Sequence, residues 1–183
     1  ALAPSDLLIC DGEHPACVAG VMGGAESEVD EKTERILLEA AWFQPPVVRR
    51  QSKRLGLSSD SSYRFDRGID PLMQRDVSDY ASALIAEICG GEVSAEALDI
   101  QLPTHPQKQS QLLLRNGQVK RILGIDPDTA TVERLLNGIG IATLKREPNG
   151  ILFELPGWRP DLGREVDLIE EVARLIGYDK IPM

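Results

Sequence analysis

The sequence is poor in the residues from which disulfide frameworks, thiolate metal sites and histidine-based catalysis are built. Among its 183 residues there are 3 cysteines and 2 histidines. Cys10, Cys17 and Cys89 are odd in number and form no Cys-x-x-Cys pair, which argues against a disulfide scaffold and a thiolate zinc site. Unpaired cysteines are typical of a reducing compartment, so the sequence predicts a cytoplasmic protein.

Long apolar runs and an excess of positive charge are also missing. No run approaches the ~20 apolar residues of a membrane span, and no basic and then apolar leader opens the chain, so we expect no membrane association. The 20 Lys and Arg residues face 29 Asp and Glu residues, a net charge of −9. Any contact with a polyanion must therefore be local. Hydrophobic residues make up 42%, which is enough for a core and excludes a disordered chain.

The length suits one large domain or two small ones, because domains usually contain ~100–150 residues. Residues 102–110 contain two prolines and no hydrophobic periodicity. We therefore predict two domains, residues 1–107 and 108–183. Because the chain begins at Ala1 without an initiator Met, we expect it to be a piece of a longer protein.

Hydrophobic periodicity predicts a mixed α/β (α+β) fold. In the first domain we expect strands at 7–10 and 16–19, a helix over 47–55 ended by Gly56, a connection over 58–70 and an amphipathic helix over 71–88. In the second we expect a strand at 112–114, helices over 118–123, 130–137 (capped by Thr129) and 165–176, and a hairpin of 141–145 with 151–155. This second pattern is winged-helix-like.

Charge is distributed unevenly between the two domains. Residues 108–183 hold 11 cations and 11 acids, so DNA is not an expected partner despite the winged-helix-like pattern. The one basic cluster lies in the first domain and comprises Arg49, Arg50, Lys53, Arg54, Arg64 and Arg67. It is either a solvated helix face or a short strip that contacts phosphates of a single strand or an RNA end.

A glycine-rich stretch runs from Gly20 through Gly23 to Gly24. It lacks the spacing of the nucleotide-binding glycine loops. Glycine allows backbone N–H groups to approach a ligand closely, so this stretch is either a ligand-cradling turn or a turn that ends a strand.

Glu39 stands inside an apolar run, residues 36–43. A carboxylate buried there without a partner would cost several kcal/mol unless its pKa shifted. Either Glu39 points outward from a half-buried strand, or it lies in a pocket and binds a ligand.

The hydroxyl-rich stretch 58–62 invites comparison with serine hydrolases, but no Gly-x-Ser-x-Gly motif surrounds it. The candidate bases are His14 and His105, and His105 stands next to a proline in the interdomain stretch. We therefore assign no catalytic residue.

The last helix carries an acidic stripe. Asp167, Glu170 and Glu171 share a helix face, and Asp161 precedes the helix. Either these four carboxylates converge on a Mg²⁺ ion, whose absence would leave them repelling one another, or they form a solvated face.

Four stretches together resemble the beta chain of bacterial-type phenylalanyl-tRNA synthetase. They are residues 19–24, 36–40, 61–70 and 167–182, and they follow the family order along nearly all of the chain. The resemblance implies that residues 1–107 are the later part of the editing (third/fourth) domain. Residues 108–183 would be the winged-helix-like (fifth) domain.

The resemblance also implies a function and a set of site residues. The family is a cytoplasmic tetramer of two alpha and two beta subunits that joins phenylalanine to tRNA(Phe), with ATP used by the alpha subunit. The beta chain hydrolyses tyrosine wrongly attached to that tRNA. By resemblance, Gly20, Gly23, Glu39 and Ser61 line the editing pocket, with Glu39 recognising the tyrosine hydroxyl. Asp161, Asp167, Glu170 and Glu171 match ligands of a Mg²⁺ ion shared with the alpha subunit.

The site histidine of that family precedes Ala1, so we expect the chain by itself to be inactive. The alternative function is a non-catalytic scaffold that binds the alpha subunit and tRNA.

Overall fold

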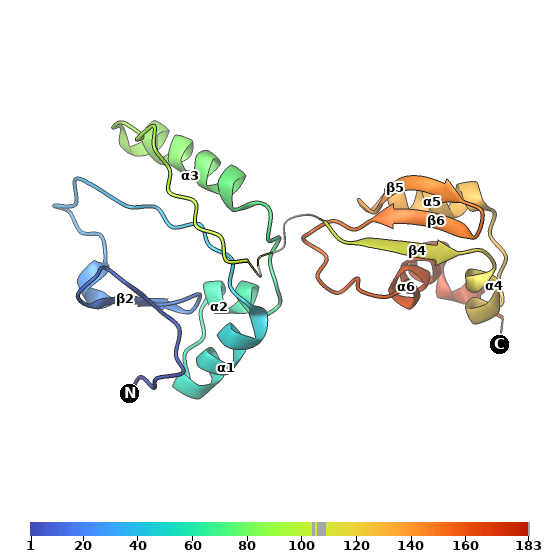
Figure 1. Cartoon of the computed structure of the whole chain (residues 1–183), viewed down its shortest axis with the longest axis horizontal. Helices are drawn as coiled ribbons and strands as arrows, with labels where there is room; N and C mark the ends of the chain where they lie inside the picture. The colour runs from blue at the N-terminus through green and yellow to red at the C-terminus, as the bar shows by residue number, and fades with distance from the viewer. Residues whose placement is uncertain (104, 106–108, 183) are drawn as a thin grey trace. The chain divides into compact units, whose positions relative to one another are not determined.

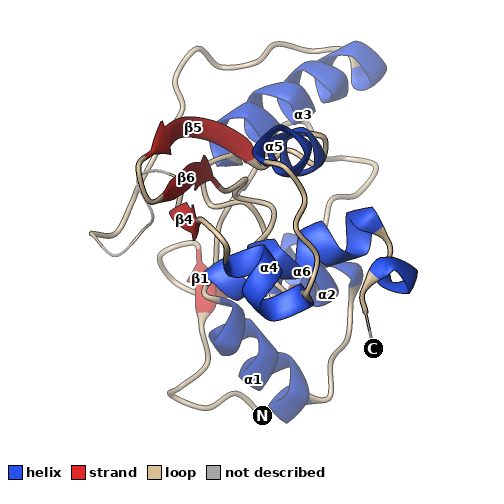
Figure 2. Cartoon of the chain, turned by 90° about the vertical axis from the view of Figure 1, so that its right-hand side faces the viewer, coloured by secondary structure: helices blue, strands red, loops and turns tan. Residues whose placement is uncertain are grey.

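The computed structural model describes residues 1–103, 105 and 109–182 and divides the chain into two units, Ala1–His105 and Pro106–Met183 (Figure 1). The boundary predicted between residues 107 and 108 lies outside the described residues. The described residues form six α-helices and two three-stranded antiparallel sheets, which confirms the predicted α+β class (Figure 2). None of the described helices is long and apolar enough to cross a membrane.

The sheet of the first unit is built from three short strands in the order β1-β2-β3. They are β1 (Leu8–Cys10), β2 (Pro15–Val18) and β3 (Met22–Gly23). The turn between β1 and β2 is held by the Asp11 carboxylate, which accepts hydrogen bonds from the backbone N–H groups of Glu13 and His14. The strand pair predicted here is therefore confirmed, and the glycine stretch adds a third strand.

Three α-helices follow in the first unit. They are α1 (Pro45–Leu55), α2 (Asp60–Phe65) and α3 (Gln74–Cys89), and a 3-10 turn (Ala25–Ser27) precedes them. Gly56 ends α1 with a left-handed φ of 66°, as predicted. The predicted connection over 58–70 is wrong, because Ser59 and Ser62 form a reciprocal capping box that starts α2.

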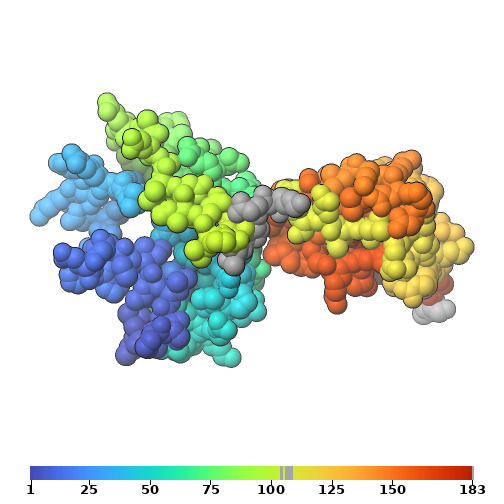
Figure 3. All heavy atoms as spheres, viewed as in Figure 1, coloured from blue at the N-terminus to red at the C-terminus, as the bar shows by residue number. Residues whose placement is uncertain are grey.

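The apolar run 36–43 forms no strand. Leu37 is 99% exposed, and Ile36 and Leu38 are also exposed. Figure 3 shows residues 25 to 40, in light blue, standing out from the rest of the first unit. The half-buried strand that the run suggested is therefore absent from this unit.

The second unit consists of a three-stranded sheet with helices packed against it. Its strands are β4 (Gln111–Arg115), β5 (Ala142–Glu147) and β6 (Gly150–Glu154), and they lie in the order β4-β6-β5. Its helices are α4 (Gln118–Leu123), α5 (Thr129–Asn137) and α6 (Glu165–Ile176), and a 3-10 turn (Tyr178–Lys180) follows them. The predicted hairpin and helices are confirmed. The cap of α5 is Asp128 rather than Thr129, since its carboxylate accepts from the backbone N–H of Thr131 at 2.7 Å.

The hydrophobic core of the chain lies in this second unit. Phe153, Leu136 and Ile141 are fully buried between the sheet and its helices. From α6, Leu168, Ile169 and Val172 join the same cluster. The acidic side chains of α6 are consequently carried on a helix that the core holds rigidly.

Candidate functional site

The structure brings the four predicted pocket residues to one cavity of about 690 Å³ in the first unit. Its wall is formed by the β2–β3 turn, by residues 39–43, by α2 and by the start of α3. The predicted residues on this wall are Gly20, Gly23, Glu39 and Ser61. These residues come from three separate stretches of the sequence, and the fold makes them neighbours.

Gly20 is required by close packing at the cavity. Its φ of 67° is left-handed, and an added Cβ would lie 3.0 Å from Phe43, 3.2 Å from Val48 and 3.3 Å from Phe65. The rings of Phe43 and Phe65 pack edge to face with centroids 5.0 Å apart. Gly20 is thus the turn that ends β2 and, at the same time, part of the cavity wall.

Gly23 has a different environment. An added Cβ there would have no heavy atom within 4 Å, so open space lies beside the backbone. A side chain at this position would occupy that space without straining the fold. Gly23 therefore leaves room for a ligand, whereas Gly20 leaves room for the protein's own aromatic side chains.

Ser61 is positioned by the cap of its helix. The Ser59 hydroxyl donates to the carbonyl of Val21 at 2.5 Å and accepts from the backbone N–H of Ser62 at 3.1 Å. The start of α2 is therefore bonded directly to the glycine turn. Ser61 and Phe65, four residues apart, share the helix face that meets the cavity.

Glu39 contributes an acceptor to the cavity. Its side chain is exposed, but neighbouring groups displace part of the water around the carboxylate, and this partial burial raises its pKa. Within the described residues Glu39 has no hydrogen-bond or ion-pair partner. It can therefore accept a hydrogen bond from a ligand, with no internal partner to displace.

Cys17 lines the cavity, but no histidine is among the lining residues that the structure describes. Burial, followed by the Glu39 charge, raises the pKa of the Cys17 thiol and keeps it protonated. Neither His14 nor His105 lines the cavity. The arrangement suits recognition of a hydroxyl group and excludes a serine or cysteine triad among these residues.

Two further polar residues on the wall were not singled out from the sequence. Asp70 is 8% exposed, and its carboxylate accepts from the backbone N–H of Leu72 at 2.9 Å. Gln74 donates to the carbonyl of Asp70 at 2.8 Å. Both line the cavity, and the Asp-Pro step at 70–71, typical of a turn, was the available signal.

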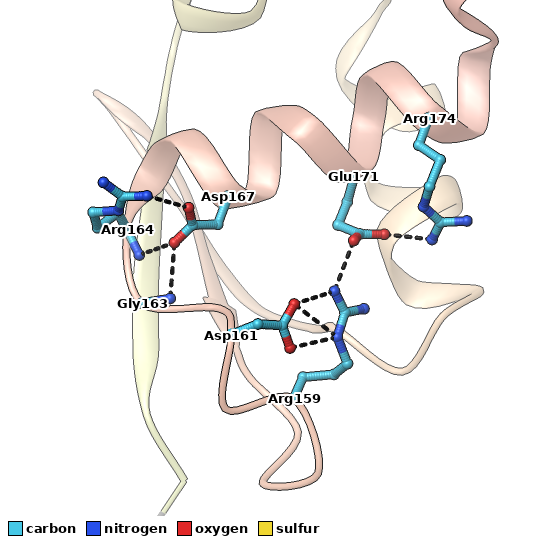
Figure 4. A network of polar contacts seen from close by, with 7 residues as sticks. All are labelled: Arg159, Asp161, Gly163, Arg164, Asp167, Glu171 and Arg174. Atoms are coloured by element: carbon cyan, nitrogen blue, oxygen red, sulfur yellow. Dashed lines mark hydrogen bonds and ion pairs between the residues drawn. The ribbon is translucent and has the colours of Figure 1, made fainter. Parts of the chain in front are cut away.

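The acidic stripe of α6 is organised by arginines (Figure 4). Arg159 bonds to Asp161 and, at 2.7 Å, to Glu171. Arg174 bonds to Glu171 from the other side at 2.5 Å. Asp161 and Glu171 are therefore each paired with a guanidinium.

Asp167 lies apart from this group and caps the start of α6. Its carboxylate accepts from the backbone N–H groups of Gly163 at 3.0 Å and Arg164 at 2.7 Å. These bonds, the Gly163 bond first, lower the pKa of Asp167. Glu170 is exposed and has no partner in the described chain.

The same contacts set the pKa of the two inner acids. The hydrogen bond from Arg159 lowers the pKa of Asp161. For Glu171 burial acts upward, but the bonds from Arg159 and Arg174 outweigh it and lower the pKa. Over residues 1–103, 105 and 109–182 no three His, Cys, Asp or Glu side chains come together as a metal site. The acidic stripe alone does not form a ligand set for Mg²⁺.

Comparisons with known proteins agree with the two-unit organisation. Residues 1–90 match the B3/4 domain family, and residues 112–178 match the tRNA synthetase B5 domain family. The chain is 46% identical over 180 residues to the phenylalanine–tRNA ligase beta subunit of Salinibacter ruber, covering 98% of this chain and 21% of that relative. It is 44% identical over 186 residues to the same subunit of Chlorobaculum tepidum, covering 98% and 22%.

A third relative is the phenylalanine–tRNA ligase beta subunit of Anaeromyxobacter dehalogenans, at 41% identity over 182 residues and 100% of this chain. The chain spans about 22% of the length of that relative. Matches of this level run along the whole chain and through both domain families. The chain belongs to the family of phenylalanine–tRNA ligase beta subunits and carries a B3/4 domain followed by a B5 domain.

Proposed function

We propose that the first unit supplies the hydroxyl-recognising part of an editing site that hydrolyses tyrosine wrongly attached to tRNA(Phe). The observation that carries this proposal is Glu39, an acceptor on the wall of a cavity that has no hydrogen-bond or ion-pair partner among the residues that the structure describes. Tyrosine would place its hydroxyl against Glu39. Phenylalanine would leave the acceptor unpaired, and a site built this way rejects the molecule that lacks the hydroxyl.

The remaining wall supports the same role. Gly23 leaves open space beside the backbone, and the aromatic pair Phe43 and Phe65 offers an apolar surface to a ring. The groups that activate the hydrolytic water are supplied by the rest of the enzyme. Attachment of phenylalanine with ATP is proposed for the alpha subunit, in a cytoplasmic assembly of two alpha and two beta subunits.

For the acidic stripe we propose a role in contact with the alpha subunit. Asp161 and Glu171 already meet at one cation, the guanidinium of Arg159. Together with Asp167 and Glu170 they would form this chain's share of a Mg²⁺ site, completed by ligands from the alpha subunit. Arg159 must release the carboxylates for that site to form.

The test of the editing role is Glu39→Ala and Glu39→Gln in the complete enzyme. Loss of one acceptor removes ~1–3 kcal/mol of hydroxyl recognition, so clearance of tyrosyl-tRNA should fall roughly ten- to hundredfold. Attachment of phenylalanine, measured in parallel, should stay within about twofold of the parent enzyme.

Glu28→Ala is the matched control, because Glu28 is an exposed acid of the same unit that does not line the cavity. Unchanged clearance in both Glu39 variants would reject the editing role.

The second candidate function is a scaffold that binds the alpha subunit and tRNA. The exposed apolar run 36–38 and α3, which has no buried residue, favour it. If Glu39→Ala edits normally while Leu37→Ser weakens assembly in sedimentation, the scaffold is the better description.

A further inference from the structure

The basic cluster occupies one region of the first unit. Residues 1–107 contain 9 cations, and 6 of them lie between Arg49 and Arg67, on α1 and α2 or just after α2. These two helices pack side by side (Figure 1). Their positive charge stands out because the same 107 residues contain 18 acids.

Part of this charge is not used internally. Arg54 pairs with Asp6, and Arg49 donates to the backbone carbonyl of Asp66. Arg50 and Lys53 are exposed, lie three residues apart on α1 and have no partner in the part of the chain that the structure describes. They are cations available to an external anion.

An aromatic side chain lies in the same region. Tyr63 is 58% exposed, and the guanidinium of Arg67 lies 3.6 Å from its ring centroid. Arg67 is held over the ring because it also donates to the Tyr63 carbonyl at 2.9 Å and to the Asp66 carboxylate at 2.8 Å. An exposed, preordered stack of a ring and a guanidinium is a platform on which a nucleobase stacks.

Helix α2 connects this platform to the cavity. Ser61 and Phe65 face the cavity, while Tyr63 and Arg67 share another face of the same short segment. A helix with its side chains is only ~10–12 Å across. A ligand bound on the outer face therefore lies about one helix diameter from the cavity wall.

We propose that the surface formed by Arg49, Arg50, Lys53, Tyr63, Arg64 and Arg67 binds the single-stranded end of an RNA whose terminal group enters the cavity. The proposal rests on the proposed editing function, which supplies the aminoacylated RNA end. Phosphates contact the exposed cations, and a base stacks on Tyr63 and Arg67. A long duplex does not fit, because the positive region is short and lies within a unit of net negative charge.

The test measures binding of a fluorescein-labelled single-stranded RNA octamer to the 183-residue chain by anisotropy, with the same octamer as a duplex for comparison. Tyr63→Ala with Arg67→Ala should weaken single-strand binding about tenfold. Arg50→Ala with Lys53→Ala should reduce the salt dependence, log Kd against log salt, by about 1.4, since each lost phosphate contact contributes ~0.7.

Tyr80→Ala with Arg75→Ala is the matched control, because both residues are exposed on α3 of the same unit. It should bind RNA like the parent chain. The proposal is overturned if the control variant loses as much RNA affinity as the Tyr63 and Arg67 variant, or if the latter loses as much affinity for the duplex as for the single strand. It is also overturned if the Tyr63 and Arg67 variant loses binding to the alpha subunit while its RNA binding stays intact.

The failure of this proposal and of the editing function can be told apart. Glu39→Ala should bind the octamer like the parent chain, since Glu39 is not part of the basic surface. If Glu39→Ala edits normally while the Tyr63 variant loses RNA, the editing role fails and the RNA surface stands. If the Tyr63 variant binds RNA normally while Glu39→Ala loses editing, the RNA surface fails alone.

Discussion

The two units differ in where their apolar side chains lie. Of the 16 buried hydrophobic residues of the described chain, 13 belong to the second unit, and Ala19, Val21 and Val48 belong to the first. Of the 23 exposed large hydrophobic residues, 18 belong to the first unit. The second unit thus has a self-contained core, whereas the first presents apolar surface that suits contact with another part of an assembly. The cavity lined by Gly20, Gly23, Glu39 and Ser61 accordingly lies in the less packed unit.

The largest effect should come from the core of the second unit. Phe153 is 0% exposed, so Phe153→Ala should lower the free energy of unfolding of this unit by about 3–5 kcal/mol. The chain has 2 tryptophans, Trp42 in the first unit and Trp158 in the second. Urea unfolding of single-tryptophan variants therefore reports each unit separately. If Phe153→Ala shifts the Trp42 transition as much as the Trp158 transition, the two units do not unfold independently.

A smaller effect is expected at the glycine turn of the first unit. Gly20→Ala should destabilise this unit by about 2–4 kcal/mol, because a left-handed alanine is strained and its Cβ meets Phe43 at 3.0 Å. Gly23→Ala should cost less than ~1 kcal/mol, since nothing lies within 4 Å of the added Cβ. Trp42 fluorescence during urea unfolding measures both. If the two variants lose the same stability, the two glycines do not differ in role.

The arginine network of the second unit should contribute less than its core. Glu171→Gln removes the charged partner of Arg159 and Arg174, and we expect a loss of about 1–3 kcal/mol. Glu170→Gln, on the exposed side of the same helix, should change stability by less than ~0.5 kcal/mol. The Trp158 transition in urea gives the comparison. Equal stability of the two variants would show that the bonds to Glu171 do not hold the fold.

The smallest expected effect is the change of folding stability with pH, and its sign is opposite in the two units. The lowered pKa values of Asp161, Asp167 and Glu171 favour folding above the ordinary carboxyl pKa, and this stabilisation is lost as the pH falls below about 4. The raised pKa of Glu39 favours folding at low pH, and this stabilisation is lost as the pH rises.

Glu39→Gln should therefore make the first unit slightly more stable at pH 7 and leave it unchanged near pH 4. Thermal unfolding followed by Trp42 at both pH values measures this. A variant that is less stable at pH 7 would contradict the raised pKa.

The sequence predicts the second unit better than the first. Gly124 and Gly177 mark the ends of α4 and α6, and both helices have the predicted bounds. In the first unit α2 was not predicted, because its six residues are too few to show hydrophobic periodicity. Its signal in the sequence is instead the capping pair Ser59 and Ser62. The run 36–43 suggested a strand, but hydrophobicity alone does not supply a neighbouring strand to bond with.

The candidate site could be predicted in part. That Gly20, Glu39 and Ser61 share a cavity follows from the family resemblance and not from periodicity, since they lie far apart in the sequence. The sequence shows the acidic stripe on α6, but it does not show that arginines pair with Asp161 and Glu171. Arg159 reaches Glu171 from a turn 12 residues earlier, and no local pattern reports such a contact.

The buried amide of Gln51 makes the first unit sensitive to deamidation. Gln51 is 4% exposed, accepts from the backbone N–H of Leu7 at 2.5 Å and donates to the Leu7 carbonyl at 3.1 Å. Through these two bonds α1 holds the segment that enters β1. Spontaneous deamidation would replace the donating NH₂ by an oxygen of almost the same size. The hydrogen bond to the Leu7 carbonyl would become a repulsion between that carbonyl and the new carboxylate. A change of almost no volume would therefore weaken the attachment of α1 to the segment that enters β1.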